Sequence, residues 1–151
     1  MKDTLKEGLT FQFAFKVPED KTVPYLLPES AEFQAMPRVL ATGYMVGLIE
    51  WTCIQAVNPH LDWPAEQTVG IGVNLTHTAA TPPGLLLTIE VRLTKVEGRK
   101  LTFAVSASDG VDSISTGFHE RFVIVADKFN RRAEEKAKAA LASVAQTTVY
   151  R

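Results

Sequence analysis

One carboxylate stands alone in a long apolar stretch of this sequence. Glu50 is the only Asp, Glu, Lys or Arg between Arg38 and Asp62. Burying a carboxylate among apolar side chains is costly unless it has partners. We interpret Glu50 as an acid, a base or a nucleophile whose pKa is tuned by its surroundings. The structural alternative is a carboxylate that caps backbone groups or pairs with an arginine.

A histidine follows a run of alternating apolar residues. The odd positions from 69 to 75 are Val, Ile, Val and Leu, which predicts a strand over 68–77 with His77 on the apolar face. That face should pack on the segment that carries Glu50, so we expect the two side chains to converge. A histidine on an apolar face is, by itself, more often a core residue than a catalytic one. Convergence with a carboxylate favours catalysis.

Thr42 lies near the start of a predicted helix over 41–58 that also contains Glu50. Threonine at this place is also a common N-cap. Eight residues of helix rise about 12 Å and leave the two side chains about 80° apart around the axis. Thr42 can therefore join Glu50 only if the chain bends back before the helix or if a dimer partner supplies the threonine.

Weaker candidates lie on predicted strands. Gly70 and Gly72 indicate either a bulge or a place where a ligand approaches the backbone. His119, Glu120 and Arg121 could supply charge near a site or form a solvated strand face.

The elements that must position these residues follow from hydrophobic periodicity. Three prolines and many apolar residues in 21–37 indicate a packed loop or lid. The helix over 41–58 is apolar on most faces, so it should be buried, with Gly43 and Gly47 allowing close approach to a sheet. The last strand carries Ile114, Phe118, Phe122 and Ile124 on one face. The predicted strands are 9–17, 68–77, 85–96, 101–107 and 113–125, followed by an exposed C-terminal helix over 128–146.

Short turns between the last four strands predict antiparallel neighbours. A single antiparallel sheet of about five strands around one buried central helix, plus the C-terminal helix, is an α+β arrangement that matches the hot-dog fold. A chain of 151 residues is expected to form one domain, 1–151.

Composition excludes several classes of function. A net charge of −1 argues against a nucleic acid partner. One cysteine, Cys53, excludes an intrachain disulfide and a cysteine-based zinc site. No apolar run is long enough to span a membrane, and no signal peptide is evident, so we expect a cytoplasmic protein without a membrane partner. No metal and no cofactor are implied.

Two sequence blocks resemble those of the fluoroacetyl-CoA thioesterase family, a branch of the hot-dog thioesterases. They are GLIEW at 47–51 and THTAATPPG at 76–84, and shorter matches extend the similarity from about Phe11 to Asn130. The resemblance implies an acyl-CoA substrate and a homodimer with its sites at the subunit interface.

The resemblance also implies roles for individual residues. The family's catalytic threonine, glutamate and histidine fall on Thr42, Glu50 and His77. Its glycine near the thioester carbonyl falls on Gly70, and its site arginine falls on Arg121.

A lid is implied as well, with Phe33 as one of its aromatic residues. Met36 stands where the fluoroacetyl enzyme has a second lid phenylalanine. The resemblance therefore supports a thioesterase more strongly than a fluoroacetyl preference.

We therefore expect a hydrolase of short acyl-CoA thioesters, with fluoroacetyl-CoA as one candidate. Glu50 would act as nucleophile or general base, and His77 would transfer protons or polarise the carbonyl. One alternative is a non-catalytic module that binds acyl-CoA or another small ligand. A hot-dog hydratase is the other alternative, but Gly72 stands where those enzymes have an aspartate five residues before the histidine.

Overall fold

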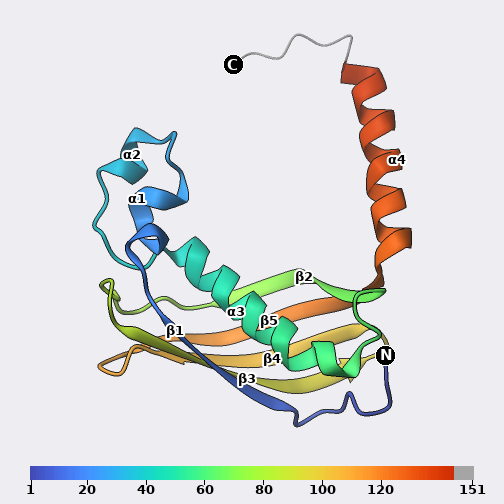
Figure 1. Cartoon of the computed structure of the whole chain (residues 1–151), viewed down its shortest axis with the longest axis horizontal. Coiled ribbons are helices and arrows are strands. Elements are labelled where there is room, and N and C mark those ends of the chain that lie inside the picture. Colours follow the sequence, from blue (N-terminus) through green and yellow to red (C-terminus); the bar gives the residue numbers. More distant parts are fainter. Residues whose placement is uncertain (145–151) are drawn as a thin grey trace.

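The structure, a computed structural model, describes residues 1–144. Five strands form one layer of sheet, and one principal helix packs on it (Figure 1). Several further helices complete the fold. In chain order the elements are β1 (Thr10–Lys16), η1 (Glu19–Lys21), α1 (Val23–Leu26), α2 (Ala31–Gln34), α3 (Thr42–Val57), η2 (Asn58–His60), β2 (Glu66–Leu75), β3 (Leu86–Glu97), β4 (Lys100–Ser108), β5 (Ser113–Val125) and α4 (Ala126–Val144).

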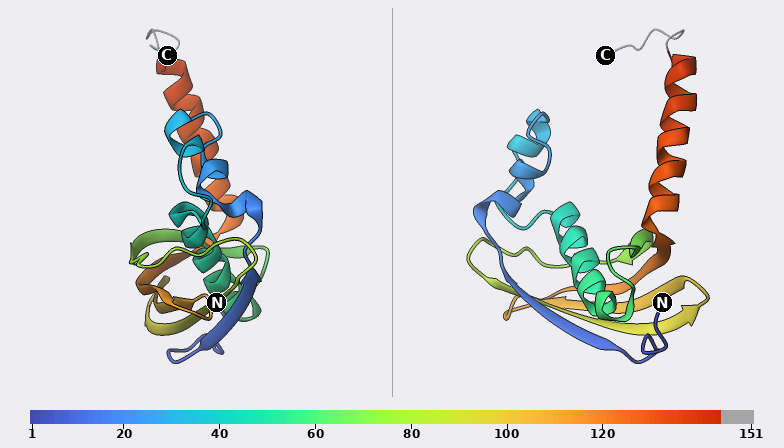
Figure 2. Two further views of the ribbon diagram at one scale, coloured as in Figure 1. Left: turned by 90° about the vertical axis from the view of Figure 1, so that its left-hand side faces the viewer. Right: turned by 45° about the vertical axis from the view of Figure 1, so that its right-hand side comes forward.

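The sheet is antiparallel, with strand order β1-β3-β4-β5-β2, and it curves around α3 (Figures 1 and 2). Inward side chains of β3 and β4 alternate with exposed ones, as period-two sequences require. They pack against Met45 and Ile49 of α3, which are fully buried. Each such side chain contributes roughly 1.5–3 kcal/mol of hydrophobic stabilisation. The predicted hot-dog arrangement is confirmed.

One predicted neighbour relation is wrong. The sequence pattern predicted that the strands now labelled β2 and β3 lie side by side, but β2 pairs with β5 at the far edge of the sheet. After β2 the chain continues along β5, where Thr78 donates to the Ile114 carbonyl. The Thr81 hydroxyl then donates to Asp109, in the β4–β5 connection, at 3.0 Å. This ten-residue connection crosses two strands rather than forming a hairpin.

The predicted faces of β2 and β5 are also wrong. A bulge between Gly70 and Gly72 shifts the register of β2, so the odd positions do not share one face. Val69 pairs with Phe122, whereas Val73 pairs with His119. Ile114 at the start of β5 is buried as predicted, but farther along the strand the inward, buried residues are odd-numbered, namely His119, Arg121 and Val123. Phe118 and Phe122 are exposed, on the opposite face.

The predicted role of the α3 glycines is not confirmed either. Gly43 faces the Leu26 side chain of α1 rather than the sheet, and a methyl group at Gly47 would meet nothing within 4 Å. The predicted packed loop over 21–37 begins at the last residue of η1 and contains α1 and α2, so it is a lid-like segment with short helices. It lies near the N-terminal end of α3 (Figure 1).

The C-terminal helix is longer at its start than predicted. α4 begins at Ala126 and projects away from the sheet, and every residue from 127 to 142 is exposed (Figure 2). The predicted end at residues 145–146 lies outside the described residues. Among residues 1–144, no helix is long and apolar enough to cross a membrane.

Gly117 provides a test of how β2 is held on β5. Its φ is +144°, and a side chain there would collide with the Asn74 carbonyl of β2. We expect Gly117→Ala to destabilise the protein by about 1–3 kcal/mol from backbone strain alone, with the collision adding to it. Gly98→Ala is the matched control, because Gly98 has φ +60° but open space around it, and it should lose only about 1 kcal/mol. Equal losses in chemical denaturation would contradict a close β2–β5 contact.

Candidate active site

A buried arginine on β5 organises the middle of the site. Arg121 donates from Nε to the Thr68 hydroxyl at 2.8 Å and from Nη2 to the Thr68 carbonyl at 2.7 Å. From Nη1 it donates to Oε1 of Glu50 at 3.1 Å. Burial lowers the pKa of Arg121, and the nearby Glu50 carboxylate opposes that shift. The guanidinium thus ties β2, β5 and α3 together at one point.

His119 completes this cluster from the same strand. Its Nδ1 lies 2.9 Å from the Gly72 carbonyl, and its Nε2 lies 3.0 Å from Nη1 of Arg121. A carbonyl only accepts and a guanidinium only donates, so Nδ1 carries the proton and the ring is neutral. Burial lowers the pKa of His119, consistent with this neutral form. His119 therefore supports Arg121 without adding a second positive charge.

Arg121 holds the carboxylate of Glu50 on one side, and its other side is open to solvent. Its side chain is 38% exposed although its partner Arg121 is buried. Gly70 lies beside it, and a methyl group at Gly70 would approach Oε1 of Glu50 to 2.5 Å. The absence of a side chain at Gly70 therefore leaves room for the carboxylate and exposes backbone next to it. This arrangement suits attack on a bound substrate or on a water molecule.

A second cluster lies at the start of α3. Oγ1 of Thr42 and Nδ1 of His77 share a hydrogen bond of 2.8 Å. Both residues line a hollow of about 250 Å³ whose other walls include Val39 and Ala79. Burial lowers the pKa of His77. Within residues 1–144, the buried Nε2 of His77 has no hydrogen-bond partner.

The expected convergence of Glu50 and His77 does not occur within one chain. His77 binds Thr42, which lies eight residues before Glu50 on α3, about 12 Å along the helix. β2 ends at Leu75, and the chain leads His77 to the N-terminal end of α3 instead of its middle. The capping alternative for Thr42 is wrong too, since Ala41 is the N-cap and the Thr42 hydroxyl faces His77.

The predicted lid residues lie on and just after α2. The Ser30 hydroxyl caps this short helix by accepting from the Phe33 amide at 3.2 Å. Phe33 is half-buried, whereas Met36 is 51% exposed. α2 packs against α1, and α1 packs against α3. The lid-like segment is therefore associated with the same end of α3 as Thr42.

Two residues of the Arg121 cluster were missed or undervalued in the sequence. The sequence pattern does not single out Thr68, and it presents His119 only as part of a charged triplet. The available signal was the alternation of His119, Arg121 and Val123, which places all three on the inner face. Phe118 and Phe122, on the other face of the strand, concealed it because they are apolar.

Neither a reactive thiol nor a metal site is found near these clusters in the described part of the chain. Cys53 is buried one turn after Glu50, and its burial raises the pKa of the thiol to about 12, so it is no nucleophile at neutral pH. Over the described part of the chain, no group of three or more His, Cys, Asp or Glu side chains could hold a metal ion.

Comparison with known proteins identifies relatives of this chain. The family model of the fluoroacetyl-CoA-specific thioesterases matches residues 22–127. The fluoroacetyl-CoA thioesterase of Streptantibioticus cattleyicolor is 51% identical over 139 residues, covering 92% of this chain and 99% of that protein.

Solved structures agree with this relationship. A structure of the fluoroacetyl-CoA thioesterase superposes with a TM-score of 0.86 at 51% identity, covering 89% of this chain and 98% of the other. A thioesterase superfamily member from Thermus thermophilus superposes with a TM-score of 0.77 at 26% identity, covering 91% and 98%. The chain belongs to the fluoroacetyl-CoA-specific thioesterase family and has the hot-dog fold of its thioesterases.

Proposed function

We propose that this enzyme hydrolyses short acyl-CoA thioesters, with Glu50 as the reacting carboxylate. The observation that carries the proposal is a half-exposed carboxylate, fixed by a buried guanidinium, beside a glycine that leaves the adjacent backbone open. A non-catalytic binding module has no need for such a group. The buried free thiol of Cys53 fits a reducing compartment, and we infer a cytoplasmic location.

Glu50 can start the reaction by either of two routes. As a general base it takes a proton from water, and the hydroxide adds to the thioester carbonyl carbon. As a nucleophile it attacks that carbon itself, forming an acyl anhydride that water then hydrolyses. In both routes the C–S bond breaks, the CoA thiolate takes up a proton, and the free acid is released. A backbone N–H near Gly70 would stabilise the oxyanion.

His77 and Thr42 would serve the leaving group and the carbonyl. The neutral imidazole at Nδ1 can accept the Thr42 proton, and its unpartnered Nε2 can bind a carboxylate or a reacting group. Because burial lowers the pKa of His77, the ring is neutral at physiological pH and can take up and return a proton. Thr42 would orient the imidazole or contact the acyl group.

The distance between the two clusters points to a homodimer. β2 is an edge strand, and Ile71 and Val73 on it are 50% and 52% exposed. An uncovered apolar edge favours pairing with a second copy. Antiparallel pairing of two copies of β2 centred near Gly72 would put residue 77 opposite residue 67 of the other copy. His77 would then lie near Thr68 and Arg121 of the partner subunit, and so near its Glu50.

The first prediction concerns the reacting carboxylate. Glu50→Gln should lower kcat by at least ~100-fold, because the amide is neither a base nor a nucleophile. The amide oxygen can still accept from Arg121, so the fold should persist with a modest loss of stability as the guanidinium loses its counter-charge. Thiol release from acetyl-CoA measures the first effect and thermal unfolding the second. A variant with wild-type kcat would contradict the role of Glu50.

The second prediction tests the shared site. Glu50→Gln and His77→Gln subunits should each form inactive homodimers. A heterodimer purified through two different tags contains one intact composite site, so it should recover about half of the wild-type activity. A heterodimer as inactive as its parents would show that the two residues act within one subunit. Light scattering that gives 16.6 kDa would exclude the dimer.

The third prediction concerns the lid. Methionine is flexible and fills irregular space, so Met36 should tolerate several short acyl groups. Met36→Phe should raise the ratio of kcat/KM for fluoroacetyl-CoA over acetyl-CoA by up to ~10-fold, within the range that pocket shape provides. Phe33→Ala should mainly raise KM. Strong fluoroacetyl selectivity in the unmodified enzyme, unchanged by Met36→Phe, would locate discrimination near Glu50 instead.

A further inference from the structure

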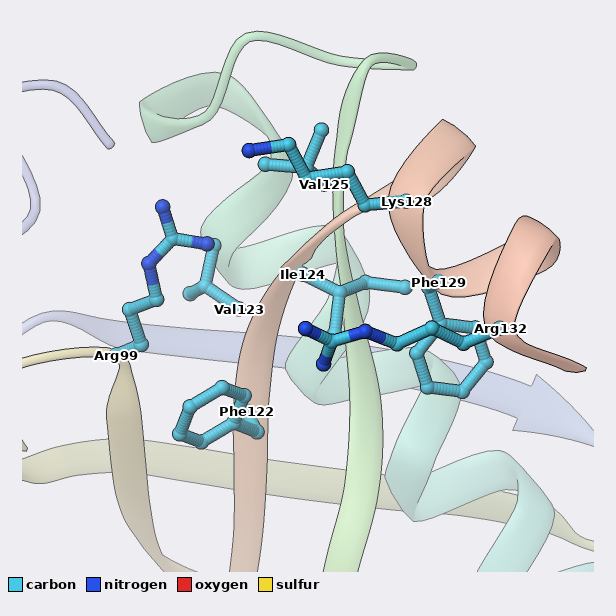
Figure 3. Close-up of a pocket in the computed structure, with 8 residues that line it drawn as sticks. All are labelled: Arg99, Phe122, Val123, Ile124, Val125, Lys128, Phe129 and Arg132. Carbon is cyan, nitrogen blue, oxygen red and sulfur yellow. The ribbon is translucent and has the colours of Figure 1, made fainter.

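His119 is fully buried in the Arg121 cluster, yet it has no part in the reaction proposed above. Its neighbours on β5 alternate between the two faces of the sheet. Glu120 lies on the outer face and pairs with Lys100 at 2.7 Å. Phe122 also lies on that face, where it lines a second hollow beside the first turns of α4 (Figure 3). His119 is therefore the side chain of this strand that can provide Arg121 with a neutral acceptor.

The hydrogen bonds of Nη1 of Arg121 indicate what His119 does. This nitrogen carries two hydrogens and accepts none. It donates to Oε1 of Glu50 at 3.1 Å and to Nε2 of His119 at 3.0 Å. The two acceptor atoms lie 3.9 Å apart. Because His119 takes the second hydrogen, Nη1 makes one hydrogen bond with the carboxylate and not two.

The other carboxylate oxygen of Glu50 is left free by this arrangement. Among residues 1–144, no group donates a hydrogen bond to Oε2, and the side chain is 38% exposed. A guanidinium with two available hydrogens commonly binds both oxygens of a carboxylate. Each further hydrogen bond stabilises the anion and makes it a weaker base and a weaker nucleophile. A single hydrogen bond therefore orients Glu50 and keeps one of its oxygens reactive.

The bulge in β2 selects the nitrogen of His119 that accepts. The Gly72 carbonyl, at the end of the bulge, accepts a hydrogen bond from Nδ1 at 2.9 Å. The one proton of the neutral ring is thus held on Nδ1, and Nε2 keeps its lone pair for Arg121. The other tautomer would direct an N–H group at the N–H group of the guanidinium. The backbone of the edge strand therefore fixes the tautomer that Arg121 requires.

We propose that His119 is a positioning residue for the hydrolysis, which limits Arg121 to one hydrogen bond with Glu50. The proposal rests on the proposed function of Glu50 as the reacting carboxylate. If the acceptor at Nε2 is lost, the released hydrogen of Nη1 turns to the carboxylate, because an unpaired N–H group in the interior is costly. Glu50 then makes a second hydrogen bond with Arg121 and reacts more slowly.

Two amide substitutions separate the two hydrogen bonds of His119. The polar atoms of asparagine are attached at Cγ, as Nδ1 is, whereas those of glutamine reach about one bond farther, as Nε2 does. His119→Asn should therefore keep the hydrogen bond to Gly72 and lose the acceptor for Arg121, whereas His119→Gln should keep that acceptor. We expect kcat for acetyl-CoA to fall about tenfold in His119→Asn and to stay within about threefold of the wild type in His119→Gln. KM should change little in either variant, because a fully buried side chain does not touch the substrate.

His60→Asn is the control for these substitutions. His60 bonds to Thr4, outside the cluster, so this variant should keep the wild-type kcat and KM. Thermal unfolding verifies that each variant is folded at the assay temperature. A kcat in His119→Asn that is no lower than that in His119→Gln, or a loss that appears only in KM, would overturn the proposal.

The tautomer is measured on the wild-type protein, so this arm does not depend on the folding of a variant. The nitrogen chemical shifts of the His119 ring, recorded by NMR at neutral pH, should show a proton on Nδ1 and none on Nε2. A proton on Nε2 would overturn the proposal. Failure of the proposed function is a separate result, because the wild-type enzyme would then hydrolyse no short acyl-CoA ester whatever the tautomer of His119.

Discussion

The buried guanidinium of Arg121 is the constraint on which the rest of this site depends. A charge in the interior is tolerated only when hydrogen bonds and an opposite charge surround it. Thr68 supplies two acceptors, His119 supplies a third, and Glu50 supplies the counter-charge. Because these partners come from an edge strand, a central strand and the helix, satisfying one cation also fixes the relative positions of three elements.

The helix α3 then determines how the chemistry is divided. It carries Thr42 at its start and Glu50 at its middle, and its regular rise keeps them apart. The chain adds His77 to the first position and Arg121 to the second. Each position has a feature that is incomplete in one subunit, an unpartnered imidazole nitrogen in one case and an open carboxylate in the other. The composite site that we propose at a two-fold axis would account for both with one arrangement.

Periodicity predicted the elements well, and the hot-dog fold followed from their order. It did not predict the faces of the last strand, because hydrophobicity is a poor guide where the inward face is polar. At this end of β5 the inward residues are His119 and Arg121, while Phe118 and Phe122 face outward. Glu50 was found from its isolation among apolar residues. Gly70 and Arg121 were only weak candidates in the strand pattern, and the family resemblance gave them specific roles, since glycine and arginine are also found in ordinary strands.

The bulge between Gly70 and Gly72 restricts the number of residues that β2 can have. Side chains alternate along a strand, so the extra residue reverses the parity of everything that follows it. Because of that reversal, Val73 after the bulge faces the same inward side as Thr68 and Gly70 before it. Losing one residue here would turn the side chains of the later part of the strand to the opposite face. The edge of the sheet is thus intolerant of odd-numbered changes in length, a restriction on sequence drift that no single catalytic residue imposes.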